Sequence, residues 1–279
     1  MMSDTLKILK KNGIKLDKRK GQNYLVNQDV LSKIIQSSEL SKNDRVLEIG
    51  AGIGTLTIPL AENANKVYAV EQDQRVAQVL KKRLKQLELD NVELIVDDAT
   101  QMDLPQANKI VSNLPYQISS PITFKILENP FEMAVLMYQK EFAQRMVATP
   151  GERNYSRLSV MMYLYSEVEM LFNVSENDFF PKPKVASAVI KLKPKNDVNI
   201  DPFFLDVTRA MFQHKKKKIR NALIDSYHEI GDFDKTELKS ILSELDQNMM
   251  NERVFKISPE ELLKISGDIK SHILTNDFN

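Results

Sequence analysis

Short apolar runs alternate with helical patterns from residue 45 to residue 193. Five runs rich in valine, leucine and isoleucine predict buried strands, at residues 45–49, 66–70, 92–96, 109–112 and 133–137. Between the second and third runs, apolar residues repeat at helical spacing from Asp73 to Leu87, and Asp73 suits the N-cap of that helix. Strands that alternate with helices indicate a mostly parallel sheet covered on both faces. The first part of the chain therefore has the pattern of an α/β fold.

The pattern changes after the fifth run. Helices are predicted near residues 141–147 and 158–165, and two further strands near 168–174 and 187–192 could pair as an antiparallel edge. The segment Lys193–Pro202 predicts a linker. Beyond it the sequence predicts helices alone, at residues 203–212, 217–227, 235–245 and 259–266. We therefore expect a sheet-containing domain over residues 1–195 and a small all-α domain over residues 196–279.

The composition is that of a soluble chain and excludes some kinds of site. Of 279 residues, 42% are hydrophobic and 28% are charged, which is enough apolar material for a packed core. The chain has no cysteine, so disulfides and thiolate metal sites are excluded, and no metal-ligand spacing occurs among its three histidines. No apolar stretch has the length of a signal peptide or of a membrane span. We expect a cytoplasmic, monomeric protein without a metal or a membrane partner.

Positive charge is concentrated in two segments although the net charge is only +1. Seven basic residues and one acid lie between Lys7 and Lys20. Eleven basic residues and three acids lie between Lys182 and Arg220, including the run Lys215–Lys218. Such runs can be solvated faces, but segregated positive charge is also typical of a protein that binds a polyanion. The charge pattern makes nucleic acid a candidate partner.

A glycine-rich turn follows the first predicted strand. Glu48-Ile49-Gly50-Ala51-Gly52-Ile53-Gly54 lets the backbone turn tightly and approach a ligand closely. The dinucleotide-binding fingerprint would need a further glycine at position 55, where this chain has Thr55. An acidic residue before Gly-x-Gly-x-Gly is instead typical of class I (Rossmann-like) methyltransferases. The turn therefore favours S-adenosylmethionine as the cofactor.

Other polar residues occupy positions suited to that cofactor. Glu71 ends the second strand, where a carboxylate can accept from both ribose hydroxyls. Asp97 and Asp98 follow the third strand, and Asp98 is the better candidate to accept from the adenine amino group because it lies further past the strand end. Gly21-Gln22-Asn23-Tyr24-Leu25, before the first strand, would contact the methionine end.

The fourth strand is followed by Asn113-Leu114-Pro115-Tyr116, at the edge where doubly wound sheets bind ligands. The Asn113 side-chain oxygen and the Leu114 carbonyl can both accept from an adenine amino group, which is a poor nucleophile that mainly needs orientation. Pro115 restricts the backbone, and Tyr116 offers a face on which a base can stack. An ordinary Asn-x-Pro turn is the alternative. The tetrad predicts methyl transfer to an amino group on a planar base.

Together these residues resemble a known family, the small-subunit rRNA adenine dimethyltransferases. The likeness covers nearly the whole chain and rests on residues 21–25, 48–52, 113–116, 139–141, 155–159, 179–185 and 212–221. The last two segments, Phe179-Phe180-Pro181-Lys182-Pro183-Lys184-Val185 and Phe212-Gln213-His214-Lys215-Lys216-Lys217-Lys218-Ile219-Arg220-Asn221, are the most specific. The resemblance implies a class I methyltransferase fold with a helical C-terminal domain. It also implies dimethylation of two neighbouring adenosines near the 3′ end of small-subunit rRNA during ribosome assembly.

The resemblance also implies roles for individual residues. Cofactor contacts would fall on Asn23, Leu25, Gly50, Gly52, Glu71, Asp98 and Asn113. Tyr116 and Phe179 would enclose the target base, held outside the RNA stack. The rRNA phosphates would be bound by Lys182, Lys184, Lys215, Lys216, Lys217, Lys218 and Arg220.

Three other functions stay open at this point. One is an erythromycin-resistance type of methyltransferase, which shares the tetrad but modifies large-subunit rRNA. Another is an assembly factor whose main output is binding to an immature small subunit, and a third is an enzyme that modifies adenine in DNA. The chain departs from common family patterns at Tyr24 and Gln117, and neither residue is a proposed contact.

Overall fold

The structure, a computed structural model, describes residues 2–14, 23–195, 200–231 and 234–276. Gly21 and Gln22 of the first predicted cofactor segment, and the basic residues Lys15 to Lys20, lie outside these ranges. Contacts divide the chain into two compact units. The first contains Met1–Ala143 and Ser166–Pro194, and the second contains Gln144–Tyr165 and Lys195–Asn279.

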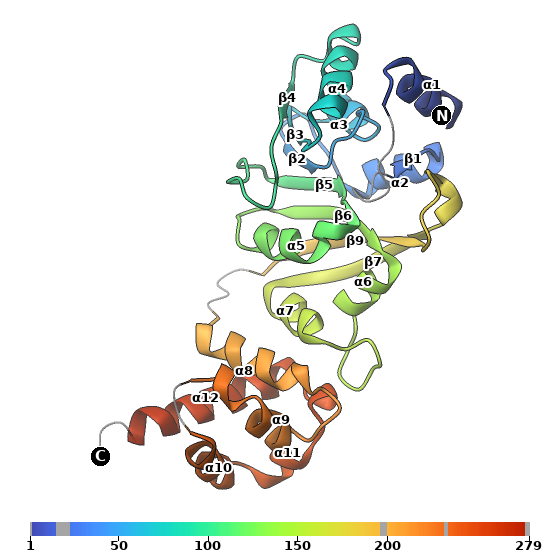
Figure 1. Ribbon diagram of the computed structural model, residues 1–279. Coiled ribbons are helices and arrows are strands. Elements are labelled where there is room, and N and C mark those ends of the chain that lie inside the picture. The colour runs from blue at the N-terminus through green and yellow to red at the C-terminus, as the bar shows by residue number, and fades with distance from the viewer. Residues whose placement is uncertain (1, 15–22, 196–199, 232–233, 277–279) are drawn as a thin grey trace. The chain divides into compact units, whose positions relative to one another are not determined.

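A seven-stranded sheet forms the centre of the first unit (Figure 1). Its strand order is β4-β3-β2-β5-β6-β9-β7. The first five strands in this order are parallel: β4 (Val92–Ile95), β3 (Lys66–Val70), β2 (Arg45–Ile49), β5 (Lys109–Asn113) and β6 (Met133–Gln139). The last two, β9 (Ser187–Pro194) and β7 (Ser166–Val174), are antiparallel. The predicted strands, their parallel arrangement and the antiparallel edge pair are confirmed.

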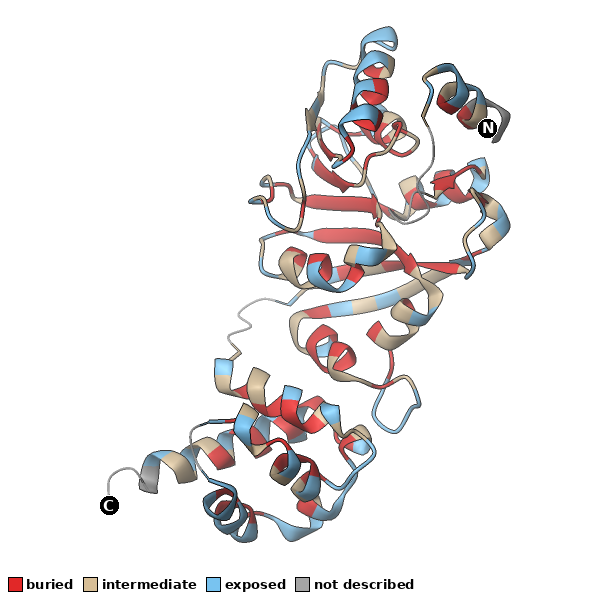
Figure 2. Cartoon of the chain, viewed as in Figure 1, coloured by how far each residue is buried: buried red, intermediate tan, exposed pale blue. Residues whose placement is uncertain are grey.

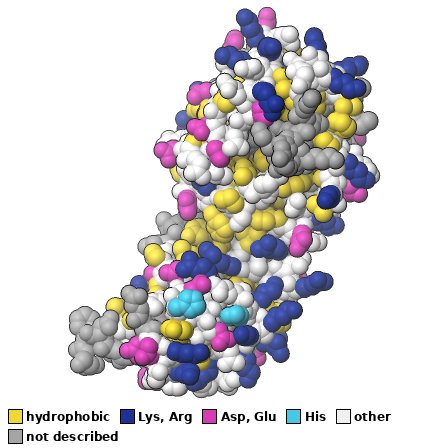
Figure 3. Space-filling view, in the orientation of Figure 1, with side chains coloured by type: hydrophobic (Ala, Val, Ile, Leu, Met, Phe, Trp, Pro, Cys, Tyr) yellow, Lys and Arg dark blue, Asp and Glu magenta, His cyan; other side chains and the backbone are white. Residues whose placement is uncertain are grey.

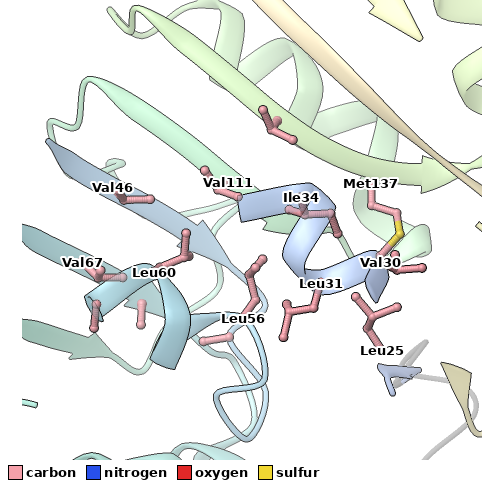
Figure 4. Packing of buried hydrophobic residues seen from close by; sticks show 14 of the residues in the cluster. Leu25, Val30, Leu31, Ile34, Val46, Leu56, Leu60, Val67, Val111 and Met137 are labelled. Atoms are coloured by element: carbon pink, nitrogen blue, oxygen red, sulfur yellow. The ribbon is translucent and has the colours of Figure 1, made fainter. Parts of the chain in front are cut away.

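One face of the sheet packs against three helices. These are α2 (Gln28–Ser37), α3 (Thr57–Asn63) and α4 (Gln74–Gln86). Figure 4 shows the side chains that fill this layer, with Leu31 and Leu60 from the helices among Val46, Val111 and others from the strands. Asp73 caps α4 as predicted, since its carboxylate accepts from the backbone N–H of Arg75.

On the opposite face, α5 (Ser119–Leu127) packs against β6. The Thr123 hydroxyl of this helix lies 2.8 Å from the Tyr138 hydroxyl of β6, and both groups are buried. Because strands β5 and β6 have helices on both sides, nearly all of their residues are buried (Figure 2). This explains why they read as continuous apolar runs rather than as alternating ones. A short helix, α6 (Lys140–Met146), follows β6 directly.

Several short elements had no clear sequence signal. The helix α1 (Met2–Lys11) packs Leu9 in a small apolar cluster with Tyr24, Ile53 and Val79. The strands β1 (Tyr24–Leu25) and β8 (Phe179–Phe180) form a separate antiparallel pair, in which Leu25 lies opposite Phe179. Two 3-10 turns, η2 (Tyr116–Ile118) and η3 (Glu176–Asp178), precede α5 and β8. The two short strands and the two 3-10 turns depend on tertiary contacts, because two or three residues carry too little pattern to predict.

Apart from an isolated bridge between Lys218 and Arg253, the regular elements in the described residues of the second unit are helices. Its elements are α7 (Arg157–Tyr165), α8 (Pro202–Gln213), α9 (Ile219–Asp225), η4 (Tyr227–Glu229), α10 (Lys235–Glu244), α11 (Gln247–Asn251), η5 (Val254–Lys256) and α12 (Pro259–Asn276). The predicted helices are present, although α12 is longer than expected and α11 was not predicted. None of the helices in the described ranges is long and apolar enough to cross a membrane.

The division by contacts differs from the predicted division in one respect. Residues 144–165, which we placed in the first domain, belong to the second unit. Tyr155 is the reason: its buried hydroxyl donates to the Ile257 carbonyl at 2.9 Å, and its ring meets the Phe212 ring edge-on at 5.6 Å. These partners are more than fifty residues away in sequence, so a reading along the chain does not find them.

Candidate active site

A cavity of about 330 Å³ lies at the carboxyl ends of strands β2, β3, β4 and β5. Its walls include every cofactor residue predicted from the sequence: Asn23, Leu25, Gly50, Gly52, Glu71, Asp98 and Asn113. Leu114, Pro115 and Tyr116 of the tetrad also line it, as do Tyr24, from the segment predicted to contact the methionine end, and Asp97, the other acid after the third predicted strand. Gln72 and Asp73 line it without having been predicted as contacts. The size falls in the range of small-molecule sites. The cavity thus brings the predicted cofactor residues and the tetrad together.

The glycine turn forms one wall in a conformation that few other residues adopt. Gly50 and Gly52 have φ of 80° and 57°. A Cβ at Gly50 would lie 3.0 Å from Cδ of Pro115, and one at Gly52 would lie 2.9 Å from Cε1 of Tyr24. The backbone is held by the Gly50 and Ala51 N–H groups, which donate to the Val70 carbonyl at 2.8 and 3.0 Å. These glycines therefore allow the turn, the tetrad and Tyr24 to pack closely around one space.

The acidic residues at the strand ends are held in fixed orientations. Glu71 accepts from the Gly52 N–H with one oxygen and from the Asp73 N–H with the other, both at 2.8 Å. Asp98 accepts from the N–H and hydroxyl of Thr100 with one oxygen, and from the Gln72 amide at 3.1 Å with the other. Hydrogen bonding to Thr100 lowers the pKa of Asp98, so this carboxylate is charged at neutral pH.

Glu48 is a buried carboxyl in the wall of the cavity. It is 2% exposed, and among the described residues its Oε2 has no hydrogen-bonding partner. Burial, assisted by the negative charge of Glu71, raises the pKa of Glu48 to about 8. The carboxyl is therefore mostly protonated at neutral pH, and it has an unused polar atom at the cavity wall.

The tetrad occupies the end of β5 and the turn that follows. The Asn113 amide nitrogen donates to the Asn23 carbonyl at 3.4 Å, which leaves the amide oxygen to accept from another group. Leu114 is buried, and Pro115 packs beside Gly50. Tyr116 is half-buried, and its hydroxyl lies 2.6 Å from the Ser187 hydroxyl of β9.

Phe179 does not line the cavity. It is 3% exposed and packs in the main core cluster, opposite Leu25 in the β1–β8 pair. Leu25 does line the cavity, and Phe179 lies on the strand paired with it, outside the cavity wall. The predicted stacking of Phe179 on a base would need this side chain to leave its present packing.

Residues 13–266 match the family model described as "Ribosomal RNA adenine dimethylase". The chain belongs to this family. It is therefore an rRNA adenine dimethyltransferase, and the resemblance noted from its motifs is confirmed.

Curated relatives match over nearly their full length. A protein of Methanosphaera stadtmanae, named as a probable ribosomal RNA small subunit methyltransferase A, is 48% identical, and the match covers 95% of this chain and 97% of that protein. A protein of the same name from Methanothermobacter thermautotrophicus is also 48% identical, with 97% of each chain covered.

Solved structures of similar proteins share the fold. The crystal structure of a dimethyladenosine transferase from Plasmodium falciparum has a TM-score of 0.74 and 32% identity, and covers 86% of this chain and 94% of that one. The crystal structure of the 23S rRNA methyltransferase ErmE has a TM-score of 0.65 and 26% identity, with 88% of this chain and 99% of that one covered. The predicted class I methyltransferase fold is confirmed.

Methyltransferases of this class use S-adenosylmethionine, and the cavity of this family member has the features that such a cofactor needs. Glu48 presents an unpaired polar atom, and Glu71 and Asp98 present ordered carboxylates. The absence of side chains at Gly50 and Gly52 lets a ligand lie close to the backbone of the turn. The residues present therefore fit the group.

The predicted RNA-binding lysines of the first unit are on its surface. Lys182 and Lys184 are both exposed in the segment between β8 and β9. Lys182 donates to the side chain of Asn177 at 2.7 Å, next to Glu176. It follows that a phosphate would compete with a local partner at Lys182.

The lysine run of the second unit has two different roles. Lys215 is half-buried and donates to the carbonyls of Arg153 and Tyr155, at 3.0 and 2.9 Å. Burial and the positive charges of Arg145 and Lys216 lower the pKa of Lys215. Its ammonium therefore supports the fold around residues 153–155. The next three lysines, Lys216 to Lys218, are exposed.

Those three exposed lysines line a second concavity, of about 340 Å³, within the second unit. Arg253 and Lys256 join them there, and neither was predicted. An isolated antiparallel bridge between Lys218 and Arg253 brings the two segments together. Arg220 is half-exposed and donates to Gln247 at 3.4 Å. On the face drawn in Figure 3, basic side chains run down the right-hand side of this unit.

Substituting Gly52 with alanine is expected to weaken S-adenosylmethionine binding by about tenfold or more. The added Cβ would meet the Tyr24 ring at 2.9 Å in a backbone with φ of 57°, and strain of this kind costs about 1–3 kcal/mol. Isothermal titration calorimetry measures the effect. Gly151→Ala is the matched control, because Gly151 has φ of 89° and no atom within 4 Å of its Cβ position. Equal affinity in the two variants would contradict the role of this close approach.

Proposed function

We propose that this enzyme dimethylates the 6-amino groups of two adjacent adenosines near the 3′ end of small-subunit rRNA during ribosome biogenesis, with S-adenosylmethionine as donor. The observation that carries the proposal is the meeting of the tetrad with the glycine turn, where Pro115 lies against Gly50 in one cavity. A donor held by the turn and an amino group held by Asn113 would thus share one space.

Bound in this cavity, S-adenosylmethionine supplies an electrophilic methyl group on a positively charged sulfur. The chain's own residues hold and orient this donor. Glu71 and Asp98 accept hydrogen bonds from the two ends of an adenosine, and both are already fixed by neighbouring donors. Asn23 and Leu25 line the part of the cavity assigned to the methionine end. Because these groups are ordered beforehand, little freedom is lost on binding.

The acceptor base is oriented by the tetrad. The Asn113 amide oxygen and the Leu114 carbonyl accept from the 6-amino group, which directs its lone pair and favours the positive charge that develops on nitrogen. Tyr116 supplies a stacking face. Phe179 completes the enclosure by moving out of its core packing when the RNA binds. Of the proposed contacts, it is the one whose side chain must move furthest from its present position.

Relatives favour the small subunit as the source of the substrate. The proteins at 48% identity bear small-subunit names, whereas the 23S enzyme ErmE is 26% identical. Large-subunit rRNA is the alternative target. We further propose that the substrate is an immature small subunit, on which the protein also acts as an assembly factor. The cytoplasmic location and the monomeric state stay predictions.

Incubation with labelled donor and immature small subunits tests the proposal. Mapping of the modified positions should find dimethyladenosine at two adjacent sites near the 3′ end of the rRNA. Large subunits and naked rRNA provide the comparison. Modification of large-subunit rRNA alone would replace the proposal with its alternative.

Replacing Lys216, Lys217 and Lys218 with glutamine is expected to weaken binding to the immature subunit and to flatten its salt dependence. The slope of log K against log salt is negative, and each lost phosphate contact reduces its magnitude by about 0.7–0.9. Lys217 also pairs with Asp225 at 2.7 Å and Lys218 with Asn251 at 3.0 Å. We therefore expect the slope to change by about 1–2, less than the full sum of about 2.1–2.7 for three contacts.

Binding is measured by filter retention at several salt concentrations. The control replaces three exposed lysines elsewhere in the same unit, Lys235, Lys239 and Lys264. Unchanged affinity after loss of Lys216 to Lys218 would show that this concavity does not bind rRNA.

A further inference from the structure

A hydrogen bond joins the tetrad to a distant part of the first unit. The Tyr116 hydroxyl, at the start of η2, lies 2.6 Å from Oγ of Ser187, the first residue of β9. The two residues are 71 positions apart in sequence. The bond therefore ties the turn after β5 to the antiparallel edge of the sheet.

Ser187 is a rigid anchor for this bond. Its backbone pairs with Gln139 of β6 on one side and with Val174 of β7 on the other. Its relative exposure is 0%, so water cannot take the place of the phenol as a partner. A buried hydroxyl that loses its partner is destabilised, which favours keeping the bond formed.

Tyr116 is held at its other end as well. Pro115 before it has a φ of −59° and packs beside Gly50, and its carbonyl accepts from the Ile118 N–H at 3.2 Å. Burial raises the pKa of the Tyr116 phenol, so the group stays neutral at physiological pH. With the backbone and the hydroxyl both held, the direction of the Tyr116 side chain is set before any substrate arrives.

We propose that Ser187 is a positioning residue for methyl transfer, because its hydrogen bond holds the Tyr116 side chain at the place where the target adenine stacks. The inference rests on the proposed function, in which Tyr116 is the stacking face. A side chain that is free to swing would bind the base in several positions, and only some of them would present the amino group in line with the donor. Ser187 thus acts through Tyr116 and does not touch the base.

A double-mutant cycle tests this role. Ser187→Ala and Tyr116→Phe remove the same hydrogen bond from its two ends, while Tyr116→Phe keeps the ring. Each is expected to lower kcat on immature small subunits by about 3- to 10-fold, the range for loss of one hydrogen bond. KM for the subunit and the calorimetric Kd for S-adenosylmethionine should stay within about twofold. The double variant should be no slower than the slower single variant.

Tyr138→Phe is the matched control. It removes a similar buried phenol–hydroxyl bond, to Thr123 at 2.8 Å, from a residue that does not line the cavity. It should lower the melting temperature and leave kcat unchanged.

Two results would overturn the proposal. Effects that multiply in the double variant would show that the two side chains act independently. An unchanged kcat in Tyr116→Phe would do the same, even if Ser187→Ala were too unstable to assay. Failure of the wild-type enzyme to modify small-subunit rRNA is a separate result, which would contradict the proposed function itself.

Discussion

Asn113→Ala should lower kcat for methyl transfer by about 100- to 1,000-fold, the usual effect of removing one group that stabilises a developing charge. The affinity for S-adenosylmethionine should change by no more than a few-fold. Asn113 ends β5, and its amide nitrogen donates to the Asn23 carbonyl. Its amide oxygen is then the atom that accepts from the amino group of the base. Glu71, Asp98 and the glycine turn, which hold the donor in our proposal, are untouched by the change.

Single-turnover kinetics on immature small subunits and calorimetry with the donor measure the two quantities separately. Asn113→Asp keeps an acceptor oxygen at the same position and should retain more activity than Asn113→Ala. Gln86→Ala, an exposed change at the end of α4, controls for surface effects. Turnover near the wild-type rate in Asn113→Ala would mean that the amino group is oriented by other residues.

The largest effect on stability is expected at Glu48. Its carboxyl has a pKa of about 8 in the folded protein against 4.5 for an ordinary glutamate, so the folded state keeps a proton that the unfolded state releases. The contribution of this group to the free energy of unfolding is therefore fully present below about pH 4.5. It is lost as pH rises through about 8. Each pKa unit corresponds to about 1.4 kcal/mol.

Glu48→Gln keeps the shape and removes the titration. Without bound donor, the variant and the wild type should have similar free energies of unfolding at pH 5, and the variant should be more stable by a few kcal/mol at pH 9. Urea unfolding at several pH values measures the difference. Glu132→Gln, an exposed carboxyl in the same unit, is the control and should show no such trend. A stability difference that does not vary with pH would contradict the raised pKa.

Local pattern was enough to predict the strands and most helices. The strands β2, β3, β5 and β6 are mostly buried, so each is a short run made largely of apolar residues. Polar residues directly after such strands must lie at one edge of a parallel sheet, which is why Glu71, Asp98 and Asn113 were expected to meet. Their roles toward donor and base remain proposals.

Other features that depend on residues far apart in sequence were not predicted. The sequence did not indicate that residues 144–165 belong with the C-terminal helices, or that Arg253 and Lys256 join the lysine run. It also assigned Lys215 to RNA, whereas its ammonium donates to two backbone carbonyls. A charged side chain looks the same in sequence whether it faces solvent or supports a loop.

The sequence by itself determined the sheet, the order of its ligand-facing residues and the family of the enzyme, because strand ends and short motifs are local. Only the tertiary structure decided which side chains constrain one another. Glu48 became a neutral buried acid through burial and the charge of Glu71, and Tyr116 acquired a fixed position through Ser187. Both effects arise between groups that the fold brings within a few ångströms, and no spacing along the chain encodes such a distance.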